Sequence, residues 1–67
     1  MHEERHIREV ITTIERWGRS PAEFQVAPDT LNPGWITVRS PTRARSYPLG
    51  RETAILVSAE LRHGLLD

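Results

Sequence analysis

Residues 34–51, GWITVRSPTRARSYPLGR, constrain the fold of this chain more than any other stretch. The run at residues 35–39 is rich in aromatic and β-branched side chains, which favour a half-buried strand over a helix. Ser40 and Pro41 begin a turn, because proline pre-sets φ and serine can hydrogen-bond to nearby backbone. Residues 44–49 would return as the partner strand, with Pro48 confining it to a sheet edge. The segment therefore predicts a β-hairpin.

The two faces of this hairpin differ in chemistry. Side chains alternate along a strand, so Ile36 and Val38 share one face, which we expect to meet the core. Trp35 and Arg39 share the opposite face together with a threonine. The hairpin is thus expected to turn an indole and a guanidinium outward.

The length of the turn decides which residues of the second strand join each face, because a shift of one residue exchanges the faces. With a three-residue turn, Arg45 and Tyr47 join Trp35 on the exposed face. With a two-residue turn, they lie on the core face beside Val38. That arrangement costs free energy unless the guanidinium of Arg45 reaches water, so we favour the three-residue register and leave the other open.

The expected exposed surface is basic and aromatic. Residues 30–51 carry four arginines and no acid, whereas residues 1–29 and 52–67 each carry two more acids than arginines. Arginine, tryptophan and tyrosine dominate the energetics of protein interfaces, which favours an acidic or aromatic-accepting protein partner. A solvated edge that protects the sheet from pairing is the alternative interpretation. The predicted binding surface comprises Trp35, Arg39, Arg43, Arg45, Tyr47 and Arg51.

An amphipathic helix is predicted for residues 2–17. Apolar residues recur there at three- and four-residue spacing and end in Trp17, which we expect to anchor the core. Gly18 supplies a C-terminal cap. Ser20 and Glu23 have the spacing of a capping box that starts a single helical turn.

A second helix is predicted for residues 52–63. The apolar run at residues 54–57 fits helix or strand, and helix is favoured because the following residues have good helix propensity and Gly64 can cap it. Such a helix is apolar on more than one side. Ile55 and Leu56 are therefore candidates for a homodimer contact.

The predicted elements give a fold class. Residues 24–26 alternate as a short strand, and Pro33 and Gly34 suit a type II turn before the hairpin. The order is α-β-β-β-α, so we expect one α+β domain over residues 1–67, a three-stranded antiparallel meander with both helices on one face. This order resembles that of double-stranded RNA-binding domains, although residues 49–53 carry only Arg51 where those domains carry lysines. Nucleic-acid binding, with arginines on phosphates and rings on bases, is the alternative function.

Catalysis is not expected. Residues 2–6 spell H-E-E-R-H, the spacing of a zinc-protease helix, but the string lies at a fraying terminus and His63 is the only other histidine. The chain has no cysteine, no nucleophile elbow and no phosphate-binding glycine loop. We expect no metal and no cofactor.

The remaining expectations concern size and compartment. No apolar run approaches the ~20 residues of a membrane span, and the polar start of the chain is not a signal peptide. We expect a soluble cytoplasmic protein with no membrane contact. The sequence predicts a non-enzymatic accessory, regulatory or inhibitory factor that binds another protein.

Overall fold

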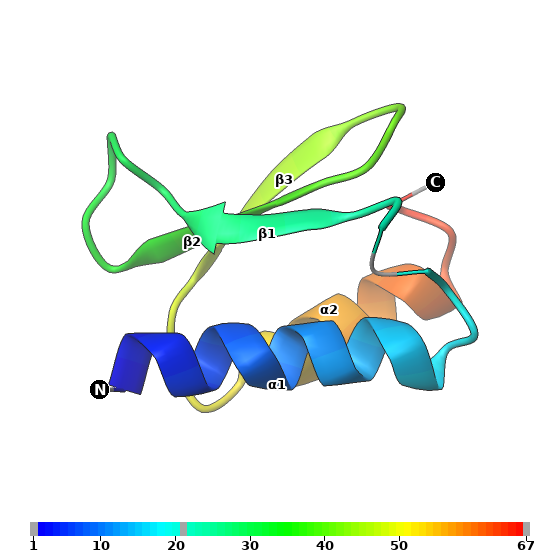
Figure 1. The fold of residues 1–67 in the computed structure, drawn as a ribbon, viewed down its shortest axis with the longest axis horizontal. Helices are drawn as coiled ribbons and strands as arrows, with labels where there is room; N and C mark the ends of the chain where they lie inside the picture. The colour runs from blue at the N-terminus through cyan, green and yellow to red at the C-terminus, as the bar shows by residue number, and fades with distance from the viewer. Residues whose placement is uncertain (1, 21, 67) are drawn as a thin grey trace.

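The computed structural model describes residues 2–20 and 22–66, with the backbone alone for His2 and Glu3. A three-stranded antiparallel sheet lies in one layer and two helices lie in the other (Figure 1). The strands follow one another in the order β1-β2-β3. The predicted α+β fold is confirmed, with its elements as α1 (His2–Arg16), β1 (Gln25–Pro28), β2 (Trp35–Arg39), β3 (Ala44–Pro48) and α2 (Thr53–Arg62).

Helix α1 buries Val10 and Ile14 completely and ends at Arg16, one residue before the predicted end. Gly18 has a φ of +73°, which glycine adopts at little cost. Its N–H donates to the Glu15 carbonyl, and the N–H of Arg19 donates to the Ile14 carbonyl. These two bonds make the C-terminal glycine motif that satisfies the last carbonyls of a helix.

Trp17 is not the core anchor that its place in the apolar stripe predicts. Trp17 directly follows the last residue of α1, and its N–H still donates to the Thr13 carbonyl at 3.2 Å. The indole of Trp17 is 41% exposed, and its Nε1 donates to the Ser58 Oγ of α2 at 2.9 Å. A polar partner on the neighbouring helix therefore holds this ring outside the core.

The hairpin register favoured from the sequence is wrong, and the two-residue turn is observed. Ser40 pairs with Arg43 across the turn, its N–H donating to the Arg43 carbonyl at 2.8 Å. Along β2 and β3, Val38 then lies opposite Arg45 and Ile36 opposite Tyr47. Arg45 and Tyr47 consequently lie on the side of the sheet that faces the helices.

The core lies between the sheet and the two helices. Gly64 ends α2 with the same motif as Gly18, with a φ of +69° and a hydrogen bond from the Leu65 N–H to the Glu60 carbonyl. The chain then turns back, and Leu66 is fully buried. The buried apolar residues are Val10, Ile14, Phe24, Ile36, Val38, Tyr47, Val57, Leu61 and Leu66.

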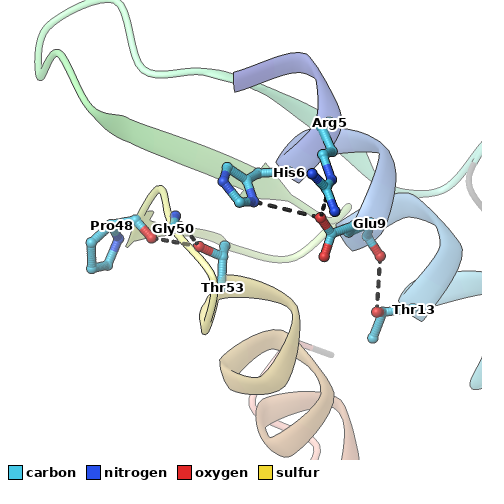
Figure 2. A network of polar contacts seen from close by, with 7 residues as sticks. All are labelled: Arg5, His6, Glu9, Thr13, Pro48, Gly50 and Thr53. Carbon is cyan, nitrogen blue, oxygen red and sulfur yellow. Dashed lines mark hydrogen bonds and ion pairs between the residues drawn. The ribbon is translucent and has the colours of Figure 1, made fainter. Parts of the chain in front are cut away.

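The connection between β3 and α2 is fixed by the polar contacts of Thr53 (Figure 2). Thr53 is 1% exposed. Its Oγ1 donates to the Pro48 carbonyl at 2.7 Å and accepts from the Gly50 N–H at 2.8 Å. A buried hydroxyl that both donates and accepts is fully satisfied. This contact fastens the start of α2 to the end of the hairpin.

The stretch before β1 is a turn and does not form the predicted helical turn. The Oγ of Ser20 accepts from the Ala22 N–H at 3.2 Å, and the Ser20 carbonyl accepts from the Glu23 N–H at 3.0 Å. Pro21, the predicted first helical position, lies outside the described residues. The backbone is extended in β1, from Gln25 to Pro28.

The β1–β2 loop is organised by Asp29. Its carboxylate accepts from the N–H groups of Leu31 and Asn32 at 2.9 and 3.3 Å. The hydrogen bond from Leu31, followed by that from the Asn32 side chain, lowers the pKa of Asp29. Gly34 completes the predicted turn, with a φ of +84° and a hydrogen bond from the Trp35 N–H to the Asn32 carbonyl. The loop thereby delivers Trp35 to the start of β2.

Candidate functional site

The face of the sheet that points away from the helices is uncovered (Figure 1). Antiparallel sheets commonly pack one face on the core and leave the other in water. We call this uncovered face the sheet platform. Its side chains, assigned from the register and the alternation of the strands, are Gln25, Ala27, Trp35, Thr37, Arg39, Ala44, Ser46 and Pro48.

The middle of the sheet platform is flat, because its side chains are small. Ala27, Thr37 and Ser46 lie side by side across the three strands. The hydroxyls of Thr37 and Ser46 are 3.5 Å apart. No bulky group in this row would keep a partner surface away from the sheet.

The two ends of the sheet platform differ in chemistry. Trp35 lies at one end with 42% of its surface exposed, beside Pro48. Arg39 lies about 13 Å away at the other end of β2, exposed beside Ala44. Its guanidinium has no ion-pair partner within residues 2–20 and 22–66. The platform thus has an aromatic end and a cationic end, as predicted for these two residues.

Leu31 is a further exposed apolar side chain, and it lies in the β1–β2 loop. It is 87% exposed in the loop that leads into Trp35. Leu31 was not predicted as a surface residue, because one leucine in a loop has no periodic pattern. The indirect signal was the Asp29 and Asn32 pair, residue types that order such loops through hydrogen bonds to the backbone.

Tyr47 and Arg45 do not belong to the sheet platform. Tyr47 is 3% exposed, and its hydroxyl donates to the Glu60 Oε1 of α2 at 2.9 Å. The Nε of Arg45 forms an ion pair with the same carboxylate oxygen. The cost of placing Arg45 beside Val38 is thus offset by a carboxylate from a distant part of the chain.

The environment of Tyr47 predicts an unusual alkaline titration. Burial, and then the hydrogen bond and charge of Glu60, raise the pKa of Tyr47 above its usual value of about 10. An unfolded chain ionises its tyrosine near pH 10, so the stability that neutral Tyr47 confers is complete below that pH and is lost above it.

This is the only tyrosine, so phenolate absorbance reports on one group. We expect the absorbance to rise only together with the loss of the circular dichroism signal of the fold. A phenolate that forms near pH 10 in a chain that is still folded would contradict the buried hydrogen bond.

The other two predicted arginines lie apart from the sheet platform. The guanidinium of Arg43 donates to the Leu65 carbonyl at 3.0 Å, which ties the hairpin turn to the C-terminal stretch. Arg51 is exposed in the turn before α2 and lines a shallow hollow with Leu49 and Leu56. The structure therefore separates the six predicted surface residues and leaves Trp35 and Arg39 together on one face.

The two predicted dimer-contact residues lie on different flanks of α2. Ile55 is 67% exposed and lines a groove between the two helices, whereas the 40% exposed Leu56 borders the hollow near Arg51. They do not form one patch. A homodimer contact through either residue stays a prediction.

The H-E-E-R-H string is only partly described, since the side chains of His2 and Glu3 lie outside the described residues. The Nδ1 of His6 is 3.6 Å from the Glu9 carboxylate, which also pairs with Arg5 at 3.7 Å (Figure 2). His63 follows the end of α2, where Arg62 packs on Trp17. Trp17 lies about three helical turns along the chain from His6, so His63 and His6 are at different ends of α1. No group of three histidine, aspartate or glutamate side chains that could hold a metal occurs in the described ranges.

Comparison with protein-family models, with curated proteins and with solved structures found no match for this chain. Neither helix, within the part of the chain that the structure describes, is long and apolar enough to cross a membrane.

Proposed function

We propose that this chain is a non-enzymatic, cytoplasmic binding module that acts as an accessory, regulatory or inhibitory factor by docking its sheet platform on another protein. The observation that carries the proposal is the uncovered sheet face, flat in its middle, with the half-exposed indole of Trp35 at one end. Tryptophan and arginine are enriched among the residues that dominate binding energy. Trp35 is the anchor, and Arg39 is the charge partner of an acidic group.

The size of the sheet platform favours a contact that extends onto the loop. Three strands of four or five residues span roughly 10 by 17 Å. A stable interface buries about 800 Å² on each partner, which is more than this area supplies. Leu31, four residues before Trp35 in the β1–β2 loop, is 87% exposed and offers a further apolar side chain. The partner is therefore expected to contact the β1–β2 loop as well as the strands.

A protein partner is better supported than a nucleic acid. Affinity for nucleic acids depends on several cations that neutralise phosphates. Arg45 pairs with Glu60, Arg43 donates to a backbone carbonyl, and neither belongs to the sheet platform. Arg39 is the only arginine among the residues of that platform. One cation beside an indole and small side chains suits a protein surface better than a phosphate backbone.

Affinity capture from an extract of the source organism tests this proposal. Thr37→Arg places a long cation in the middle of the sheet platform and should abolish retention of the partner. Ala22→Arg is the matched control, because Ala22 is exposed in the turn before β1 and lies neither on the sheet platform nor in the groove between the helices. We expect the control to retain the same protein as the unchanged chain.

Retention of that protein should change only modestly as the salt concentration rises. A complex with nucleic acid would instead weaken steeply. Equal retention by the Thr37→Arg and Ala22→Arg variants would show that the sheet platform is not the binding surface.

A further inference from the structure

A groove runs between α1 and α2 on the side of the helix layer away from the sheet. The part beside Trp17 has a volume of about 410 Å³, and a second hollow of about 390 Å³ continues it toward the start of α1. Thr13, Arg16 and Ala54 line both parts, which makes them one continuous feature. The core-facing residues of the helices, such as Val10 and Val57, lie on the opposite side. We call this feature the helix groove.

The wall of the helix groove is a fixed aromatic ring. The indole N–H of Trp17 donates to the Ser58 Oγ at 2.9 Å, and the guanidinium carbon of Arg62 lies 5.8 Å from the ring centroid. Ile55, which is 67% exposed, lines the same groove from α2. Two large apolar side chains that stay exposed in one groove are typical of a binding surface.

The charge on the helix groove is positive. Arg16 and Arg62 line the part beside Trp17, and no acidic residue lines that part. Neither forms an ion pair with another described residue. In the continuation, Arg5 and Arg8 each pair with a glutamate of α1 and are largely neutralised. The uncompensated charge is therefore concentrated around Trp17.

This charge distribution selects an acidic occupant. In a two-fold symmetric dimer formed through the groove, each Arg16 and Arg62 would face the same cationic region of the other copy. Like charges placed across an interface cost free energy and act against such pairing. An acidic segment would instead gain favourable charge interactions with Arg16 and Arg62. Charge complementarity therefore favours a different protein chain over a second copy.

We propose that the helix groove binds an acidic amphipathic segment of a partner protein, with an apolar side chain against Trp17 and Ile55 and carboxylates at Arg16 and Arg62. Grooves of this kind bind one apolar face of a partner helix. The site lies on the opposite side of the molecule from the sheet platform. It does not depend on the function proposed for that platform, and together the two surfaces would let the chain bridge two proteins.

A peptide titration tests the helix groove. The probe is a synthetic helix in which leucine recurs every three or four residues and glutamate fills the other positions. A matched peptide carries glutamine for every glutamate. The chain has two tryptophans, so Trp35→Phe leaves Trp17 as the only indole reporter. We expect the acidic peptide to change Trp17 fluorescence saturably and the glutamine peptide to bind roughly tenfold more weakly.

The arginines are tested by the anisotropy of the labelled acidic peptide. The Arg16→Gln/Arg62→Gln double variant should bind it roughly tenfold more weakly. The control is Arg39→Gln/Arg51→Gln, which removes the same charge outside the groove and should bind as the unchanged chain does. Equal losses in both double variants, no saturable change, or a Trp17 signal that changes with protein concentration alone would each overturn the proposal.

Discussion

Replacing Glu60 by alanine is expected to destabilise the protein by about 2–3 kcal/mol. The substitution leaves the hydroxyl of Tyr47, a 3% exposed residue, without its acceptor, which costs about 1–3 kcal/mol. It also removes the partner of Arg45, which adds less than about 1 kcal/mol because that side chain is 42% exposed. A chain of this size has roughly 3–5 kcal/mol in total, so a large share of its stability would be lost. Urea unfolding followed by circular dichroism measures the change.

Two control variants separate the hydrogen bond from the ion pair. Glu60→Gln keeps an acceptor for Tyr47 and should cost about half as much or less. Tyr47→Phe removes the hydroxyl, so adding Glu60→Ala to it should cost clearly less than Glu60→Ala alone. Additive losses from these two substitutions would mean that the Tyr47 hydroxyl and Glu60 do not interact.

Trp35→Ala is expected to weaken binding of the captured partner by roughly 30-fold or more, which corresponds to about 2 kcal/mol. The indole is 42% exposed on the uncovered face, so its loss removes the anchor without opening the core. Unfolding should therefore change by less than about 1 kcal/mol. Calorimetric titration with the purified partner measures the affinity.

The matched control is Trp17→Ala, which removes the same side chain from the helix groove and should leave this affinity unchanged. Arg39→Gln should weaken binding less than Trp35→Ala does, since exposed ion pairs contribute about 1 kcal/mol or less. A larger loss from Arg39→Gln than from Trp35→Ala would show that charge dominates the contact. Arg43 and Arg45 are unsuitable for this comparison, because both make contacts within the fold.

Most of the fold was predictable because its signals are local. Gly18 and Gly64 mark both helix ends, and the structure shows the expected positive φ at each. Alternation along β2 placed Trp35 outside and Ile36 inside, and Pro33 with Gly34 set the turn before them. Each signal depends on a few neighbouring residues.

The hairpin register was not predictable because the contact that decides it is distant. The choice between the two turns depended on whether Arg45 finds a partner on the core side. That partner, Glu60, lies in a helix whose own placement was not known from the sequence. Of the two aromatic residues expected on the exposed face, Trp35 lies there and Tyr47 lies in the core.

The helix groove was missed for a related reason. Trp17 continues the apolar stripe of α1, and a stripe alone does not show how much of its last ring the rest of the chain covers. The hydrogen bond from its indole to Ser58 joins two elements separated by the entire sheet in sequence. Only the packing of α1 against α2 brings Arg16 and Arg62 to the same groove.

The most direct test of the sheet platform is a map of backbone amide shifts on binding the purified partner. Docking on this face predicts that the largest shifts occur in residues 25–28, 35–39 and 44–48 and in the loop around Leu31. Amides of the outer surface of α1 and α2 should change little. Large shifts confined to the two helices, with the amides of Trp35, Thr37 and Ser46 unchanged, would contradict the proposed binding surface.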